Sequence, residues 1–311
     1  MSSPSRPRAG WDDAPPKQRA RTYYAATTWI YRWAWGSSFH FAPLVAGHSR
    51  RAAIAAYESR IADCLEVEPG ATVLDLGCGI GGPAQAVAAR TGARVVAINA
   101  TPEQLLAMPR RWRQPEGRIA PIGGDFQALP LATAVADGAF AFEALCHAVD
   151  LGATFREVRR VLRPGAVLCF SDWCLTASFD PGNREHMDLR RTIESSYGVV
   201  RLRSHAEWRQ GLAEAGFVIE RLADAAGDEA EPWYRALQPR DRSLDGLARA
   251  SWSRTLQESL LRIAERLGLA PPGTGSAVRS LRAGTVALVR AGELGIFTPM
   301  LFARCHNPDV G

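Results

Sequence analysis

Residues 73–84 read Val-Leu-Asp-Leu-Gly-Cys-Gly-Ile-Gly-Gly-Pro-Ala, and four of these twelve residues are glycines. The apolar run 71–76 predicts a buried strand, and a helix is expected to open at Pro83, where a missing N–H costs nothing. The glycines between them suit a tight turn, because glycine tolerates positive φ and lets a ligand approach the backbone closely. The sequence therefore predicts a strand, a turn and a helix whose open N–H groups face a ligand.

Two ligand classes fit this turn. Gly77 and Gly79, with Gly82, match the spacing of the dinucleotide fingerprint, in which a pyrophosphate rests on the helix N-terminus. Asp75 lies two residues before the first glycine, where its carboxylate would repel a pyrophosphate but would suit a cation such as the amino group of S-adenosylmethionine (SAM). We therefore expect SAM rather than NAD, with Gly81 also in the cofactor-binding turn.

Polar residues also follow the next two predicted strands. The run 94–98 ends at Asn99, whose amide can bond ribose hydroxyls but lacks the charge that an NAD site usually has there. The run 119–122 is followed by Asp125 and Phe126, a carboxylate and a ring that suit an adenine. Each residue alone could be an ordinary turn residue. Because parallel strands end at one edge of a sheet, together they predict one nucleoside-like ligand.

The composition indicates one elaborated α/β domain. The chain has 311 residues, of which 47% are hydrophobic, enough for a packed core. Of its 37 basic residues only Lys17 is a lysine, and the arginines are spread along the whole chain. The net charge of +5 therefore does not indicate a nucleic-acid partner, although it could help to hold an anionic substrate.

The cysteines and the N-terminus indicate a compartment. The six cysteines form no CxxC pair and no metal-ligand spacing, so we expect reduced thiols of a cytoplasmic protein and no metal site. Residues 1–18 are rich in Ser, Pro and Arg and have no apolar core, which predicts a disordered tail rather than a signal peptide or a transmembrane segment.

Residues 23–41 hold eight aromatic rings in nineteen positions. A core-packing helix is one explanation. We favour a lid, residues 19–50, over a substrate cavity, because ring faces stabilise a cationic reaction centre without acting as nucleophiles. The residues expected to take part are Tyr24, Tyr31, Trp33, Trp35, Phe39, His40 and Phe41.

Several segments resemble the sterol C24-methyltransferase family. They are residues 35–43, 74–83, 143–148, 172–176, 232–234 and 296–300, and the resemblance runs from about residue 23 to residue 307. Arg32 and Leu145 depart from the usual residues of that family, whereas Gln104 in the cofactor region is kept. The resemblance implies SAM as cofactor and methylation of a carbon–carbon double bond in an isoprenoid. It also implies an α/β fold, a Rossmann-like seven-stranded class I methyltransferase sheet with a helical N-terminal lid and a C-terminal helical insert.

Candidate catalytic residues follow the fourth and fifth predicted strands, residues 138–142 and 166–171. Methyl addition to an alkene leaves a carbocation, which ends by losing a proton to a positioned base. His147 could accept that proton, and Glu143, which also borders the cofactor, could accept it or stabilise the cation. Asp172 and Trp173 could steer or shield the cation, and Tyr24 and Tyr31 complete the catalytic set. For Glu143 and His147, a helix cap and a packed ring are the simpler alternatives.

The C-terminal third is expected to complete the sheet and the cavity. The runs 217–221 and 295–303 predict strands, the first an antiparallel addition, with helices over 244–267 and 275–290 between them as a cavity wall. Trp233 and Tyr234 open this insert and are expected to face the substrate. The predicted divisions are a tail (1–18), a lid (19–50), a SAM-binding domain (51–225) and a substrate region (226–311).

Three functions remain open from the sequence. The first is C-methylation of a sterol or sterol-like side chain. The second is C-methylation of a prenyl diphosphate, which might need Mg²⁺, or of a prenylated bacterial metabolite. The third is a SAM-binding protein without transferase activity. The expected partner is a small isoprenoid rather than a nucleic acid, and homo-oligomerisation is left open.

Overall fold

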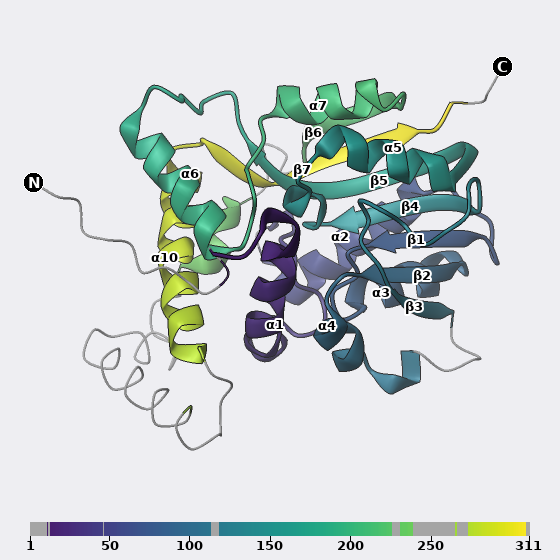
Figure 1. The fold of residues 1–311 in the computed structure, drawn as a ribbon, viewed down its shortest axis with the longest axis horizontal. Coiled ribbons are helices and arrows are strands. Elements are labelled where there is room, and N and C mark those ends of the chain that lie inside the picture. The colour runs from purple at the N-terminus through teal and green to yellow at the C-terminus, as the bar shows by residue number, and fades with distance from the viewer. Residues whose placement is uncertain are drawn as a thin grey trace, which may run out of the picture.

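The computed structural model describes residues 11, 13–45, 47–112, 118–225, 231–238, 265 and 273–308. A seven-stranded sheet in the order β3-β2-β1-β4-β5-β7-β6 forms its middle layer (Figure 1). The strands are β1 (Thr72–Leu76), β2 (Arg94–Asn99), β3 (Ile119–Gly123), β4 (Ala136–Phe142), β5 (Leu162–Leu175), β6 (Val218–Asp224) and β7 (Phe297–His306). The predicted α/β fold is confirmed.

The direction of the strands places the site. Strands β1, β2, β3, β4 and β5 all pair in parallel with their neighbours in this group. Strand β7 lies between β5 and β6 and is antiparallel to both. The reversed strand is therefore β7, and β6, which the sequence predicted as an antiparallel addition, runs in the direction of β1. The order of the sheet turns back at β1, between β2 and β4, and such a switch point leaves a crevice at the carboxyl ends of the strands.

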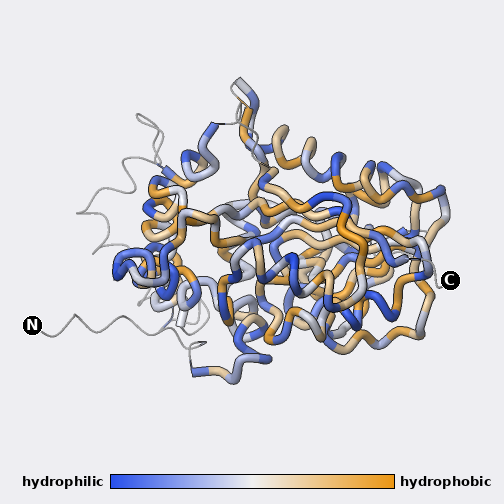
Figure 2. The backbone as a smooth tube through the Cα atoms, turned by 90° about the horizontal axis from the view of Figure 1, so that it is seen from above, coloured by the Kyte–Doolittle hydropathy of each residue, from blue (hydrophilic) through white to orange (hydrophobic). Residues whose placement is uncertain are grey.

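Helices cover both faces of the sheet. They are α1 (Pro16–Trp35), α2 (Arg50–Cys64), α3 (Gly82–Thr91), α4 (Pro102–Ala107), α5 (Leu151–Val161), α6 (Arg184–Ser196), α7 (His205–Glu214) and α10 (Thr274–Glu293), with 3₁₀ turns η1 (Arg110–Trp112), η2 (Leu145–His147) and η3 (Trp233–Leu237). Helices α2 and α3 pack on one core cluster, and α5 and α7 on the other. Much of the chain with hydrophobic residues, orange in Figure 2, lies in the middle of the molecule.

Helix α1 stands beside the sheet, in contact with α4 and α10 (Figure 1). It begins at Pro16, so residues 16–18, which the sequence assigned to a disordered tail, are helical. Trp11 is also buried, and its Nε1–H donates to the carbonyl of Ser195 at 2.7 Å. Residues 1–10 and 12 lie outside the described residues.

The second expected helical region is confirmed in part. Helix α10 covers the predicted helix over 275–290, whereas the predicted helix over 244–267 lies outside the described residues, apart from 265. None of the helices in the described ranges is long and apolar enough to cross a membrane.

Candidate active site

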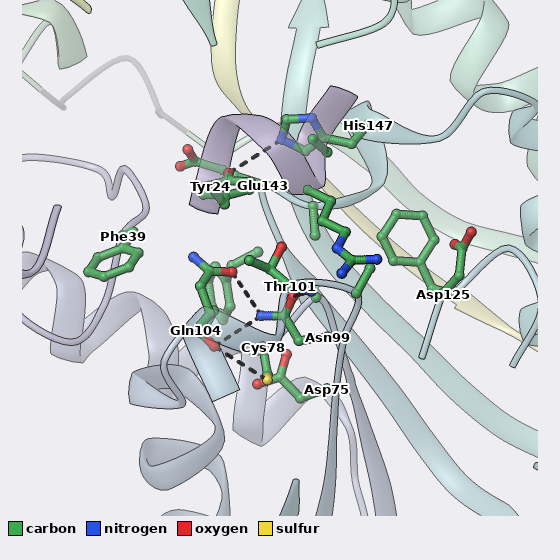
Figure 3. Close-up of a pocket in the computed structure, with 18 of the residues that line it drawn as sticks. Tyr24, Phe39, Asp75, Cys78, Asn99, Thr101, Gln104, Asp125, Glu143 and His147 are labelled. Atoms are coloured by element: carbon green, nitrogen blue, oxygen red, sulfur yellow. Dashed lines mark hydrogen bonds between the residues drawn. The ribbon is translucent and has the colours of Figure 1, made fainter. Parts of the chain in front are cut away.

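Two cavities meet at the carboxyl ends of β1 and β4. The first, here called the cofactor cavity, is bordered by the glycine turn and the polar residues that follow β1, β2 and β3. The second, the aromatic cavity, is enclosed by rings of α1 and by side chains of α10. Four of the described residues line both: Tyr24, Phe39, Glu143 and His147 (Figure 3). A group transferred from one ligand to the other would pass these side chains.

The glycine turn leaves room and a charge for a ligand. Gly77 and Gly79 adopt the predicted positive φ, with values of 86° and 53°, and line the cofactor cavity. Asp75 is buried beside them, and its Oδ2 has no hydrogen-bond partner among the described residues. Burial raises the pKa of the Asp75 carboxyl well above its ordinary value. A buried, unpaired carboxyl oxygen is costly, so the site fits a cationic ligand group such as the ammonium of SAM.

Asn99 holds the turn together. Its Nδ2 donates to the carbonyl of Gly79 at 3.0 Å and to Oε1 of Gln104 at 2.8 Å, and its Oδ1 accepts from the backbone N–H of Thr101 at 2.9 Å (Figure 3). Both amide hydrogens are therefore used within the protein, and only Oδ1 can still accept from a ribose hydroxyl. Gln104 also lines the cavity. Its Oε1 accepts the hydrogen bond from Asn99, which leaves its amide nitrogen as the donor that can face a ligand.

Of the remaining residues predicted to bind the cofactor, two line the cofactor cavity and one does not. Asp125 and Phe126, which the sequence predicts to bind the adenine, line the cofactor cavity, and Oδ1 of Asp125 accepts from the backbone N–H of Gln127 at 2.9 Å. Gly81 does not line it. That residue, with φ of 88°, is the N-cap of α3, and a Cβ there would meet Met108 at 2.7 Å. Its part is to shape the turn.

The aromatic cavity contains most of the predicted rings and several residues that the sequence did not single out. Tyr31, Trp35, Phe39, Phe41 and Trp173 line it. Helix α10 adds Leu281, Thr285 and Leu288, whose i, i+4, i+7 spacing places them on one helix face. Tyr197, Cys146 and Val199 are also part of the wall. The spacing in α10 was readable from the sequence, but its partner was not.

Four residues predicted for this cavity lie elsewhere. Trp33 is 87% exposed, because residues two apart on a helix point in directions roughly 200° apart and Trp35 takes the inner face. Trp233 packs behind the wall, with its ring centroid 5.4 Å from that of Phe41, and Tyr234 packs against Trp233. His40 lines the cofactor cavity instead.

Glu143 is fixed by two donors from opposite sides. Its Oε1 accepts from the backbone N–H of Phe41, and its Oε2 accepts from Nε1–H of Trp173 at 2.8 Å. The residue has a positive φ of 48°, which is unusual for a side chain other than glycine. Burial raises the pKa of the Glu143 carboxyl to about 8, against the lowering effect of those two donors. The carboxylate is thus held in one orientation at the junction of the cavities.

His147 is a neutral base in contact with Tyr24. Its Nδ1 donates to the carbonyl of Gly198 at 3.2 Å, and a carbonyl can only accept, so Nε2 carries no hydrogen. Nε2 accepts from the hydroxyl of Tyr24 at 3.3 Å (Figure 3). Burial lowers the pKa of His147 to about 4 and raises the pKa of the Tyr24 phenol well above 10. Tyr31, in turn, shares a hydrogen bond between its hydroxyl and that of Tyr23.

Asp172, predicted to be catalytic, lines neither cavity. It is 0% exposed, and its Oδ2 accepts from the backbone N–H groups of Leu145 and Cys146 at 2.7 and 3.2 Å. Its Oδ1 accepts from the N–H of Trp173 at 2.7 Å. Burial raises the pKa of Asp172 to about 6. Asp172 therefore holds the backbone of η2, the turn that carries His147.

The amino-acid sequence is similar to two protein families and to enzymes of plants and fungi. Residues 74–170 match the methyltransferase domain family, and residues 245–309 match the sterol methyltransferase C-terminal family. The chain is 34% identical over 293 residues to cycloartenol-C-24-methyltransferase 1 of Oryza sativa subsp. japonica. This alignment covers 92% of this chain and 84% of that protein. The chain belongs to the sterol C24-methyltransferase family. It is 33% identical to the sterol 24-C-methyltransferase of Yarrowia lipolytica, over 92% of this chain and 78% of that one.

Membership of the sterol C24-methyltransferase family confirms two predictions from the sequence. The protein is a SAM-dependent C-methyltransferase, and SAM is its cofactor. Solved structures share the fold: the cyclase SpnF has a TM-score of 0.71 at 21% identity, covering 96% of this chain and 98% of that one. Geranyl diphosphate C-methyltransferase from Streptomyces coelicolor A3(2) has a TM-score of 0.67 at 15% identity, covering 95% and 98%.

Proposed function

We propose that this enzyme methylates the side-chain double bond of a sterol or a sterol-like isoprenoid. The observation that carries the proposal is the position of Glu143, a buried carboxylate that lines both the cofactor cavity and the aromatic cavity. A cation that forms where the cavities meet would have this carboxylate beside it. The sterol acceptors for which the plant and fungal relatives are named support the same acceptor class.

The cofactor cavity offers a partner for each part of SAM. Asp75 would pair with the ammonium group, and Oδ1 of Asn99 and the amide nitrogen of Gln104 would bond the ribose or the amino acid end. Asp125 and Phe126 would hold the adenine. Bound SAM supplies an electrophilic methyl group on a sulfonium, so the protein has to align the reacting atoms and keep water away.

The residues at the junction would manage the positive charge. Addition of the methyl group to one alkene carbon leaves the other carbon cationic, and the face of a nearby ring such as Phe39 and the carboxylate of Glu143 both stabilise it. The reaction ends when a C–H bond breaks, its electron pair forms the new double bond and a base takes the proton. The bare Nε2 of His147 can take it through Tyr24, whose hydroxyl passes its own hydrogen to Nε2.

The character of the aromatic cavity disfavours a prenyl diphosphate. Its described lining is aromatic and aliphatic apart from a few polar groups, with Glu143 as the carboxylate among them. The described Lys17 and Arg21 line the cofactor cavity instead. A diphosphate in the aromatic cavity would face a carboxylate without a described lysine or arginine to offset the repulsion.

The proposal is tested by transfer of a labelled methyl group from SAM to a panel of acceptors. The panel contains a Δ24-sterol, geranyl and farnesyl diphosphate with Mg²⁺, and a prenylated indole, and mass spectrometry identifies the products. Label in the sterol side chain is the expected result. Label solely in a smaller isoprenoid would refute the sterol assignment, and tight SAM binding without any labelled product would favour a protein that has lost transfer.

A further inference from the structure

The loop of residues 36–41, here called the lid loop, lies against the glycine turn. A Cβ added to Gly82 would collide with the carbonyl oxygen of Ser37 and with Oγ of Ser38, and one added to Gly79 would lie 3.8 Å from the ring of Phe39. Ser37 and Phe39 also line the cofactor cavity, so the loop forms part of its wall. Cofactor entry or exit past this wall requires the lid loop to move.

Glu58 of α2 ties the lid loop down. Its side chain is buried, with 6% of the residue exposed, and its Oε1 accepts from Oγ of Ser38 at 2.6 Å and lies 3.3 Å from Nε2 of His40. A buried carboxylate is retained at a cost unless charged or hydrogen-bonding partners compensate for lost hydration. Here the partners that compensate both come from the lid loop.

His40 completes the tie from the loop side. Its Nδ1 donates to the carbonyl of Phe41 at 2.8 Å, and its Nε2 faces the carboxylate of Glu58. Both partners are hydrogen-bond acceptors, and the two ring nitrogens of His40 are the groups that face them. The ring also stacks on Phe142 with a centroid distance of 4.2 Å. His40 thus joins α2, the lid loop and the end of β4.

The same loop reaches the reacting centre. The carbonyl of Phe41 accepts from His40, and the N–H of Phe41 donates to Oε1 of Glu143. Phe142, beneath the His40 ring, immediately precedes Glu143 in the chain. Closing the loop therefore covers the cofactor cavity and supplies one of the two donors that orient Glu143.

We propose that Glu58 and His40 are positioning residues that latch the lid loop over bound SAM and, through Phe41, orient Glu143. The effect on cofactor exchange follows from the contacts described above, whereas the effect on turnover rests on the proposed function of Glu143. Measuring cofactor exchange alone therefore keeps the two apart.

The test is the release of labelled S-adenosylhomocysteine in a chase experiment, with association measured by rapid mixing. The variants are Glu58→Gln and His40→Gln, and Asp63→Asn is the matched control, because Asp63 also lies on α2 but makes an exposed ion pair with Arg90. Loss of one charge-assisted contact should speed release about tenfold without slowing association. The control should release within about twofold of the wild-type rate.

The double variant separates a latch from two unrelated contacts. If Glu58 and His40 act as a pair, changing both speeds release little more than changing either one. Release at the wild-type rate from a variant that melts as a folded protein would overturn the latch. Slower association with unchanged release would also overturn it, because that pattern indicates a distorted cavity. If Glu58→Gln does not fold, His40→Gln decides the question.

Discussion

The indole Nε1–H of Trp173 donates to Oε2 of Glu143 at 2.8 Å, so a ring of the aromatic cavity holds a carboxylate that both cavities share. The hydrogen bond uses the N–H at the edge of the indole, and the same ring lines the aromatic cavity. Trp173 therefore serves the acceptor cavity and the carboxylate together. Because Glu143 is also buried, its charge depends on pH and on the cation beside it.

We expect activity to rise as the pH increases through about 8. Burial raises the pKa of Glu143 to about 8 in the free enzyme, so the side chain is protonated below that pH and gains its charge above it. The carboxylate stabilises the cation that forms on the acceptor, so kcat/KM, which reports free-enzyme groups, should increase through this range. Glu143→Gln should lose the step near pH 8, leaving titration by Asp75. A wild-type profile that is flat from pH 6 to 9 would contradict the assignment.

The same pKa has a consequence for stability. Between the ordinary pKa of 4.5 and the folded-state value of about 8, the folded protein holds a proton on Glu143 that the unfolded chain has released. The contribution of this group to the free energy of unfolding therefore falls as pH rises through that window. Melting curves of the wild type and Glu143→Gln across pH 5 to 8 should show the difference between them shifting in favour of the variant.

Asp75→Asn should weaken cofactor binding severely. The substitution keeps the shape of the side chain but removes the charge of the carboxyl whose Oδ2 has no partner within the described residues. Loss of a buried ion pair costs about 3–5 kcal/mol, so affinity for S-adenosylhomocysteine, measured by calorimetry, should fall at least about a hundredfold. Asp63→Asn is the control. An affinity within about threefold of wild type would show that another group holds the ammonium.

Asp172→Asn should act on stability more than on the cofactor. The change turns an acceptor into a donor that faces the backbone N–H groups of η2, and each unsatisfied buried group costs about 1–3 kcal/mol. The free energy of unfolding should fall by roughly that amount, with S-adenosylhomocysteine affinity kept within a few-fold. Full stability together with a selective loss of turnover would instead place Asp172 in the chemistry.

Trp33 and Trp35 form a matched pair for testing the aromatic cavity. Trp35 lines that cavity and carries the guanidinium of Arg50 at 3.5 Å from its ring centroid, whereas Trp33 faces solvent. Trp35→Ala should lower kcat/KM for the sterol about tenfold or more, the scale of a lost apolar contact in a pocket. Trp33→Ala should leave it unchanged. Equal losses in the two variants would argue against the described wall.

Local patterns in the sequence were sufficient for the first strands and the cofactor turn, but not for the direction of β6. The stretch 73–84 specifies its own strand, turn and helix because glycine φ values and strand alternation act over a few residues. The placement of Asp75, Gly77 and Gly79 at the cavity follows from the same short range. The helix over 275–290 was likewise predicted, because its apolar face repeats with helical period.

Orientation and long-range partners could not be predicted in the same way. Asp172 and Trp173 are neighbours on one strand, and alternation sends one away from the cavity and the other into it without showing which. Trp33 was predicted for the cavity because the whole stretch was treated as one lid, although a helix turns it away. The tie of Glu58 to His40 joins residues whose contact depends on how α2 and the lid loop dock.

Single-turnover methyl transfer to a Δ24-sterol by Glu143→Gln tests the central claim most directly. The variant keeps the volume of the side chain but cannot carry the charge that we place beside the forming cation. We predict SAM binding within a few-fold of wild type and a transfer rate lower by about a hundredfold, the scale of a removed charge-stabilising group. Transfer at the wild-type rate would contradict the role given to Glu143 and the account built on it.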